Sequence, residues 1–575
     1  MWNTRVRLVV LSMLLVGASI PVRAQGRGGP PPWTTSGADA QRTAAVRTDP
    51  KIDKDSVQKA FAFLWKRSLE DQPRQLDALT QPVLLPNIIS YKGFKALAFV
   101  GAAGDTVYAL DYDLSKIFWQ RRLETGIAPQ NASVECSGAL TTVTRATTLT
   151  PSAGGRGGRQ GGAIQPPPGA AGTPAAAAAG VPPAPGAAVV GGAPDPRLAS
   201  AAGRGAPPPP PAADANPPRP GSGPGPNAAL GGYSASRGGN PNVYAISSGG
   251  ALHALNPQDG TDMVPPIPFL PPRARAVGSV LLDSVLYTAT TGACGGAPNG
   301  VWAIELANNA NTVTKWETRA PIAGDGPAFA ADGTVFVATG SSGASAADAN
   351  AIVALEPKTL TMKGSFSAAK TPFTTSPIVF TSAGRTLVAA GNKDGRVYIV
   401  DASALAAGRQ STPLAASDPL GDARATITGL ATADDGSGGR WIFASVAGAA
   451  RGGEAATHGA VVALQLASQD SGPALRVGWT SRDLTSAVTP AIVNGVVFAL
   501  ASGEDRGGGS AAERAKRSTP AVLYALDAAT GKELWSSGST IASFVHDVGP
   551  SAGDSQVYVV TYDGTVWAFG IPMER

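Results

Sequence analysis

The adjacent residues His546 and Asp547 are the pair in this chain best suited to proton transfer. A buried imidazole beside a carboxylate can take a proton from a substrate and later return it. The same pair can equally form a structural hydrogen bond that has no catalytic role. We therefore treat both residues as catalytic candidates and expect them to begin a strand near the end of the chain.

Arg273, Arg275 and Asp325 are candidates for cofactor or ligand binding. Two guanidinium groups separated by a single residue, Ala274, could bind an anion, although a solvated loop is the simpler explanation. Asp325 lies between two glycines ahead of Pro327, where it could hold a ligand or a metal ion, or merely shape a turn. The three histidines of the chain are far apart and show no metal-ligand spacing, so no metal site is predicted.

The elements that must position these residues are short strands that recur along the chain. Their pattern is a five-residue apolar phrase that usually ends in a polar residue, such as VYALD at 107–111 and LYALD at 523–527. The eight phrases begin at residues 107, 252, 301, 352, 397, 461, 523 and 566. Apart from one long insert, their spacing approaches the roughly 40 to 50 residues of a four-stranded propeller blade. The sequence therefore predicts an all-β fold, an eight-bladed β-propeller of four-stranded antiparallel blades.

Tryptophan recurs in this pattern and is expected to fill the space between blades. The residues concerned are Trp65, Trp119, Trp316, Trp479 and Trp535. We place them on the first strand of each blade, where a large buried ring would stabilise the stacking of neighbouring sheets. Asp111 and Asp527 each precede a tryptophan by eight residues, and Gly531 lies in the turn between. These turn residues are interpreted as structural, because Gly permits positive φ and Asp hydrogen-bonds to local amides.

The N-terminus has the features of a secretory signal peptide, which would be residues 1–24. Arg5 and Arg7 precede an apolar run at 8–16 that is too short to span a bilayer, and cleavage is expected after Ala24. No later stretch is long and apolar enough for a transmembrane segment. The sequence therefore predicts a periplasmic or secreted protein.

Composition divides the remainder of the chain. Residues 25–50 form an irregular N-terminal segment, residues 51–150 hold the first blade and the start of the second, and residues 241–575 hold the other blades. Residues 151–240 consist mostly of Gly, Ala and Pro and cannot bury enough apolar surface to fold, so a disordered insert is predicted. A smaller flexible insert is expected at 503–518.

The net charge and the cysteine content limit the classes of function that the protein could have. The formal net charge of +5 comes largely from the signal peptide and the 151–240 insert, so the folded part is near neutral and nucleic-acid binding is not predicted. The chain has two cysteines, Cys136 and Cys294. In an exported protein they could form a disulfide, and two buried free thiols are the alternative.

The phrase ALDAATGKELW at residues 525–535 resembles the tryptophan-docking repeat of the pyrroloquinoline quinone (PQQ)-type β-propellers. A second copy at 109–119 has Ser115 in place of the turn glycine. This group includes quinoprotein alcohol dehydrogenases and scaffold lipoproteins of outer-membrane assembly. The resemblance covers roughly residues 60–145 and 241–570 and implies the quinoprotein alcohol dehydrogenase-like fold.

What the resemblance implies for chemistry is less direct. Dehydrogenases of the group hold PQQ and Ca²⁺, and they use an Asp base and a disulfide between adjacent cysteines. This chain has no adjacent cysteines, and no acidic base or metal set falls on matched positions. The sequence therefore favours a non-catalytic binding or scaffold module, expected to be a monomer with a protein or polysaccharide partner in the cell envelope. The alternative is a PQQ-dependent dehydrogenase that oxidises an alcohol or sugar.

Overall fold

A computed structural model of the chain describes residues 33–572 with internal gaps. The gaps are 71–75, 77, 91–92, 124–135, 137–141, 150–241, 308–309, 344–346, 369–370, 436–438, 452–455 and 470–471. The expected signal peptide at 1–24 and the insert at 151–240 therefore lie outside the described residues.

The strands form eight sheets, which are the blades of a β-propeller. Blade 1 contains β3 (Val83–Ser90), β4 (Gly93–Gly101), β5 (Thr106–Asp111) and β6 (Lys116–Arg122). Blade 2 contains β7 (Thr142–Arg145), β8 (Val243–Ile246), β9 (Ala251–Leu255) and β10 (Ile267–Pro268). Blade 3 contains β11 (Ala276–Leu282), β12 (Val285–Thr290), β13 (Asn299–Glu305) and β14 (Val313–Thr318). Blade 4 contains β15 (Ala328–Phe329), β16 (Val335–Ala338), β17 (Ile352–Leu355) and β18 (Met362–Phe366).

The second half of the chain repeats the plan. Blade 5 contains β19 (Ile378–Ser382), β20 (Arg385–Gly391), β21 (Val397–Asp401) and β22 (Ala415–Ala416). Blade 6 contains β23 (Thr426–Asp434), β24 (Arg440–Ala447), β25 (Gly459–Gln469) and β26 (Gly472–Thr480). Blade 7 contains β27 (Ala491–Val493), β28 (Val496–Ala501), β29 (Val522–Asp527) and β30 (Glu533–Ser536), with β1 (Ala45–Val46) added beside β27. Blade 8 contains β31 (Ser551–Gly553), β32 (Gln556–Val560), β33 (Thr565–Gly570) and β2 (Ala62–Ser68).

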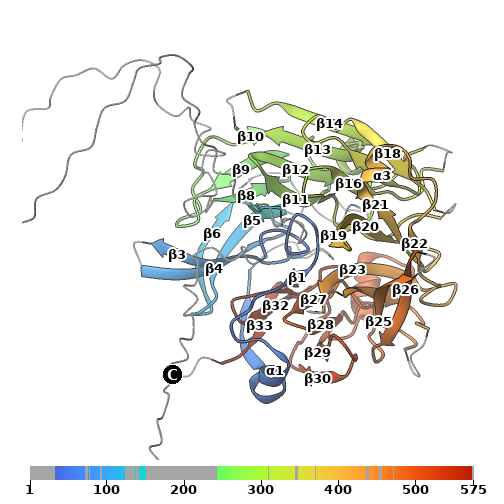
Figure 1. The fold of residues 1–575 in the computed structure, drawn as a ribbon. Helices are drawn as coiled ribbons and strands as arrows, with labels where there is room; N and C mark the ends of the chain where they lie inside the picture. Colours follow the sequence, from blue (N-terminus) through green and yellow to red (C-terminus); the bar gives the residue numbers. More distant parts are fainter. Residues whose placement is uncertain are drawn as a thin grey trace, which may run out of the picture. The chain divides into compact units, whose positions relative to one another are not determined.

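The ring closes with a strand from near the start of the chain. β2 pairs antiparallel with β33, so residues 62–68 complete the last blade, whereas the repeat pattern alone assigns this region to the first. First strands of neighbouring blades contact one another from β3 to β11 and from β15 to β31, and β31 returns to β3. Figure 1 shows β1 lying among these first strands at the centre of the propeller. A closed ring leaves no open end in the series of sheets.

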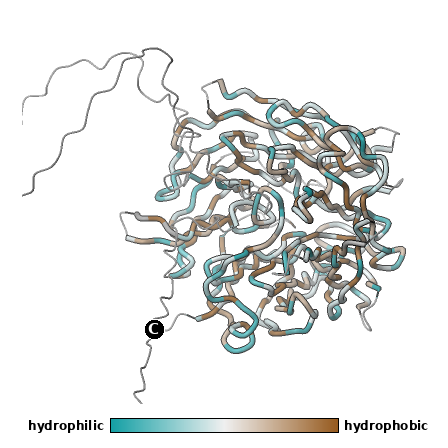
Figure 2. The backbone as a smooth tube through the Cα atoms, viewed as in Figure 1, coloured by the Kyte–Doolittle hydropathy of each residue, from teal (hydrophilic) through white to brown (hydrophobic). Residues whose placement is uncertain are grey.

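The core lies between neighbouring blades. Apolar side chains of blades 2 and 3 form one cluster, and similar clusters join blades 3 and 4, 4 and 5, and 5 and 6. Figure 2 shows hydrophobic stretches along the strands and hydrophilic stretches in loops at the periphery. Each sheet therefore buries its two faces against its neighbours, which an isolated blade could not do.

The five blade-docking tryptophans lie on the outermost strands, β2, β6, β14, β26 and β30. We expected them on the first strands, which was wrong. Each lies on the fourth strand, because it pairs with the recurring apolar phrase, and that phrase is the third strand of each blade. Four of the tryptophans stand opposite the alanine of that phrase: Trp65 opposite Ala568, Trp119 opposite Ala109, Trp479 opposite Ala463 and Trp535 opposite Ala525.

Two tryptophans dock on a glycine in a turn of the next blade. The Nε1 of Trp479 donates to the carbonyl of Ala528 at 2.9 Å, and a Cβ on Gly531 would lie 2.6 Å from the indole. The Nε1 of Trp119 donates to Pro257 at 2.8 Å, and a Cβ on Gly260 would lie 2.7 Å from its ring. Each indole therefore needs a glycine beneath it.

The other tryptophans pack differently. Trp535 makes an edge contact with Phe61, with ring centroids 4.9 Å apart, and Trp65 contacts Tyr558. Trp316 packs at the margin of the cluster between blades 3 and 4. These residues fill space between sheets without the glycine contact.

The aspartates of the repeat shape the turns that follow them. Asp527 accepts hydrogen bonds from the amides of Ala529 and Thr530 at 2.8 and 3.1 Å, and Asp111 accepts one from Leu114 at 3.3 Å. Gly531 has φ +72°, a conformation that favours glycine. These contacts produce the tight turn between the third and fourth strands.

Residues 33–46, which we call the strap, run through the centre of the ring and contact its blades in chain order. The carbonyl oxygens of the strap accept hydrogen bonds from amides of the first strands in six blades: Trp33 from Leu84, Thr34 from Arg145, Ala40 from Phe329, Gln41 from Val379, Thr43 from Thr432 and Ala44 from Ile492. In blade 3, the Thr35 hydroxyl donates to the carbonyl of Ser279 at 2.5 Å. Just beyond the strap, Asp49 accepts from the amide of Ser555 in blade 8 at 2.7 Å.

Helices are few in the described part of the chain. They are α1 (Lys54–Ala60), α3 (Ala402–Ala406) and α4 (Ala511–Arg517), with a 3₁₀ turn at Cys294–Gly296. The segment 503–518, expected to be a flexible insert, contains α4, which is capped by Ser510 and whose Arg517 pairs with Asp505 at 2.9 Å. None of the described helices is long and apolar enough to cross a membrane.

Cys136 and Cys294 are joined by a disulfide. Cys136 lies between β6 and β7, and Cys294 lies between β12 and β13 of blade 3. The bond therefore ties the connection between blades 1 and 2 to a loop of blade 3.

Candidate functional site

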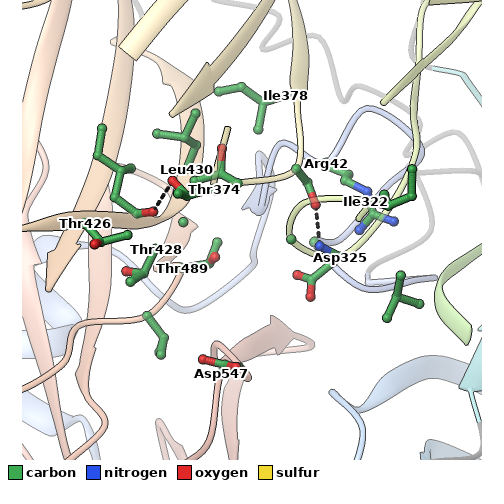
Figure 3. A pocket seen from close by; sticks show the side chains of 18 of the residues that line it. Arg42, Ile322, Asp325, Thr374, Ile378, Thr426, Thr428, Leu430, Thr489 and Asp547 are labelled. Atoms are coloured by element: carbon green, nitrogen blue, oxygen red, sulfur yellow. Dashed lines mark hydrogen bonds between the residues drawn. The ribbon is translucent and has the colours of Figure 1, made fainter. Parts of the chain in front are cut away.

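A polar funnel lies in the central channel, where loops ahead of the first strands converge. Its main cavity has a volume of about 320 Å³, and a neighbouring one of about 130 Å³ shares part of its lining. Arg275, Asp325 and Asp547 line both cavities. They precede the first strands of blades 3, 4 and 8, so residues distant in sequence meet at one place. Figure 3 shows Asp325 and Asp547 in this funnel with Arg42 near Asp325.

Two of the candidates from the sequence lie elsewhere. Arg273 is exposed on the turn ahead of β11 and is not among the lining residues. His546 is buried beside the funnel, where its Nδ1 lies 2.7 Å from the Oε1 of Glu504. Its Nε2 lies 3.3 Å from the Oδ2 of Asp547, so the predicted pair is in contact, with Asp547 lining the cavity and His546 buried behind it.

Arg42 of the strap forms part of the funnel wall. Its Nε donates to the carbonyl of Pro327 at 2.7 Å, its Nη1 to Ser36 at 3.0 Å and its Nη2 to Gly278 at 3.2 Å. Burial lowers the pKa of Arg42 to about 10, against the opposing charges of Asp325 and Asp39. The side chain therefore stays cationic at neutral pH and joins the strap to blades 3 and 4.

Asp325 is open to the cavity, but the surrounding protein partly desolvates its carboxyl and so raises its pKa above the ordinary value; the charge of Arg42 only partly offsets this effect. The Asp325 amide donates to the Ser376 hydroxyl oxygen at 2.5 Å, which holds its loop against blade 5. A carboxylate with a raised pKa in a recess can accept a proton or a hydrogen bond from a ligand.

Asp547 is held as an anion by its neighbours. Burial alone would raise its pKa, but the charges of Arg506, His546 and Arg275 hold the pKa well below the ordinary value. The Nη2 of Arg506 lies 2.5 Å from the Oδ1 of Asp547, whose backbone has φ +50°. A non-glycine residue with positive φ is uncommon, and here it turns the carboxylate toward the funnel.

Arg506 comes from the ordered loop between β28 and β29 that also supplies Glu504. Glu504 is fully buried, and it pairs with Arg514 of α4 and with Arg506 at 3.4 Å. Ligand atoms of Glu504, His546 and Asp547 lie within 4.8 Å of one another, a spacing that a metal ion could use. Because two arginines already neutralise the two carboxylates, this geometry disfavours a further cation.

Hydroxyl groups around the funnel join neighbouring blades. Thr374 donates to the carbonyl of Ile427 at 2.7 Å, and Thr428 donates to that of Ala487 at 2.6 Å. Figure 3 shows Thr374, Thr428 and Thr489 on the side opposite Arg42. The funnel is therefore a rigid polar recess whose wall comes from several blades.

Sequence reasoning missed Arg42, Arg506 and Glu504. Arg42 lies in an irregular segment without periodic pattern, so nothing in the sequence placed it in the channel. Glu504 and Arg506 follow β28 in the run Gly503-Glu504-Asp505-Arg506, and this charged run directly after a strand was the available signal.

Comparisons with known proteins agree with the propeller fold. The family described as outer membrane protein assembly factor BamB matches residues 459–571. The quinohemoprotein alcohol dehydrogenase of Comamonas testosteroni is 13% identical with a TM-score of 0.53, over 95% of this chain and 81% of that one. A europium-containing methanol dehydrogenase is 11% identical with a TM-score of 0.52, over 94% of this chain and 98% of that one. No curated protein matches the sequence.

At such low identity the structural likeness shows the fold alone, while the family match adds the repeat itself over the last part of the ring. The chain therefore has the propeller fold of these dehydrogenases, and its residues 459–571 carry the repeat of the matching family.

Proposed function

We propose that this protein is a non-catalytic binding module of the periplasm or cell exterior, and that the funnel holds its ligand. The observation that carries the proposal is the lining itself, in which Arg275, Arg506, Asp325 and Asp547 present fixed polar groups in a recess. Rigid, convergent polar groups are what a small-ligand site requires. The disulfide and the N-terminal sequence support export, because such bonds persist in oxidising compartments.

The chemistry of the funnel favours an anionic, hydroxyl-rich ligand. Three lining arginines, Arg42, Arg275 and Arg506, face two lining carboxylates, so the balance of charge is positive. The threonine hydroxyls and carboxylates add groups that hydrogen-bond to sugar hydroxyls. An acidic sugar, as found at the end of an envelope polysaccharide, meets both requirements.

Calorimetric titration with galacturonate tests this ligand class, with galactose as the uncharged counterpart. We expect saturable binding of galacturonate and at least ten-fold weaker binding of galactose. Arg506→Ala should weaken galacturonate binding at least ten-fold, because it removes a lining charge. Arg517→Ala is the matched control, since Arg517 pairs with Asp505 outside the funnel. Equal binding of both sugars, or no binding of either, would contradict the proposal.

The lining does not fit PQQ well. A planar quinone with several carboxylates needs cationic partners and a flat face, and Arg275 and Arg506 could supply only the first. No described residue of the main cavity lining is aromatic, and its two carboxylates would repel the cofactor's own. We therefore derive no redox step from this site.

A PQQ-dependent dehydrogenase is the second candidate, because the Asp325 carboxyl lines the funnel and has a raised pKa, as catalytic bases often do. Reconstitution with PQQ and Ca²⁺, followed by dye reduction with alcohols and sugars, tests it directly. Dye reduction that depends on Asp325, and is lost in Asp325→Asn, would replace the binding proposal. A protein that takes up no quinone and reduces no dye would support binding.

A further inference from the structure

The strap is additional to the ring and not one of its blades. All eight sheets have four strands without β1, because β2 completes blade 8. The strap contributes only the two-residue β1, which lies parallel to β27. The ring is therefore complete around a separate segment that occupies its channel.

The ring binds this segment mainly through backbone groups. Six first strands each direct one N–H at a strap carbonyl, and blade 3 accepts from the Thr35 hydroxyl. Unpaired N–H groups on the channel edge would otherwise lack a protein partner. This is the chemistry by which an extended peptide adds to a sheet edge, distributed here over separate sheets.

The channel imposes a conformation on the strap. Ala38, Arg42 and Ala44 have φ of +79°, +56° and +51°, which side-chain-bearing residues rarely adopt. The side chains of Trp33, Ala40 and Ala44 are almost completely buried. A free segment would not hold this shape, so the ring acts on the strap as a receptor acts on a bound peptide.

Arg42 occupies a socket shaped for it. A Cβ on Gly278 would lie 2.1 Å from the Nη2 of Arg42 and 1.6 Å from the carbonyl oxygen of Asp325, so only glycine fits there. The guanidinium group donates to the carbonyls of Gly278 and Pro327. This socket gives the backbone contacts a fixed register.

We propose that the channel wall is a receptor for a peptide segment of this irregular shape, filled here by residues 33–46 and exchangeable with the same segment supplied in trans. One backbone contact per blade gives affinity, and the Arg42 socket gives specificity. Because Gly37 and Arg42 line the funnel, the occupant also shapes the site above it.

The test uses the full chain with a specific protease site inserted between the exposed residues Arg47 and Thr48. The folded protein is cleaved, and retention of the strap is followed by size-exclusion chromatography and mass spectrometry. A fluorescent synthetic peptide of residues 33–47 is then added, and its incorporation is measured by fluorescence anisotropy. We expect the cleaved strap to stay bound and to exchange with the peptide before the ring unfolds.

Peptide variants test the specificity. Arg42→Ala in the peptide should speed its release at least ten-fold, whereas Arg47→Ala, which removes only an exposed ion pair with Asp434 at 3.8 Å, should change the rate about two-fold or less. Equal incorporation of a scrambled peptide would overturn the proposal. So would immediate loss of the strap on cleavage, or exchange only when the ring itself unfolds. No funnel ligand is present in this experiment, so its result is independent of the binding function.

Discussion

At the scale of single residues, the funnel holds two carboxylates whose environments shift their pKa values in opposite directions. Arg506 and its neighbours hold the pKa of Asp547 low, while desolvation by the surrounding protein raises that of Asp325. The same funnel therefore contains one carboxylate that stays charged and one that protonates more readily. Their contributions to stability have opposite dependence on pH.

Asp547→Asn should flatten the acid side of the stability curve. Above the ordinary aspartate value of 3.8, Asp547 is charged in both states and its ion pairs stabilise the fold. This contribution is lost as the pH falls below that value through the lower folded pKa. The variant should be less stable at neutral pH and lose less free energy of unfolding between about pH 5 and about pH 3. Urea unfolding at several pH values measures this, and parallel curves for the two proteins would contradict it.

Asp325→Asn should change stability in the other direction. The raised folded pKa of Asp325 means that its contribution is present at acid pH and lost as the pH rises through that pKa. The stability of the variant relative to the natural protein should therefore increase from about pH 4 to about pH 7. The same urea series serves as the measurement. A difference that does not vary with pH would show that Asp325 has an ordinary pKa.

The sequence predicted part of this site. Asp547 was a candidate as the partner of His546, Arg275 as an anion-binding residue and Asp325 because it lies between two glycines. Their convergence could not be seen in the sequence, because it depends on how the ring closes. Arg42 and Arg506 were not identified as site residues, because neither lies in a repeated element.

At the scale of elements, the docking of tryptophan on a turn glycine joins successive blades. Gly531→Ala should destabilise the protein by about 2 to 4 kcal/mol, from strain at positive φ and from the clash with Trp479. Gly538→Ala is the matched control, because Gly538 has φ +52° but open space around it, and should cost only about 1 kcal/mol. Guanidinium unfolding measures the free energy of unfolding of both variants. Equal losses of stability would exclude a role for the indole contact.

The repeated phrase was enough to predict strands, turns and blades, because each blade must satisfy the same packing. It did not show which strand of the blade it was. An outermost strand with Trp119 precedes the first strand of the next blade in the sequence, so the two can be exchanged without changing the pattern. Only the pairing of β5 with β6 settles the order.

At the scale of the whole molecule, the disulfide joins residues separated by 158 positions. Replacing both Cys136 and Cys294 by Ser should lower the free energy of unfolding by about 2 to 5 kcal/mol, because the unfolded chain gains freedom. Unfolding of the natural protein with and without a reductant gives the same comparison without substitution. If neither change moved the midpoint, the bond would have no role in stability.

The architecture was predictable because apolar periodicity repeats along the chain. The strap was not, because residues 33–46 have no periodicity and derive their structure from contacts with distant strands. Burial of Arg42 and Thr43 in the channel follows from the closed ring and not from any local preference. An irregular segment at a terminus can therefore be as ordered as the repeat beside it.

The pairing of β2 with β33 has a consequence for how the protein is made. Synthesis produces residues 62–68 long before residues 565–570. The early strand therefore keeps an unpaired edge until β33 has been made. A product that stops short of β33 should leave this edge open to other chains, so aggregation of truncated protein is the expected cost of this form of closure.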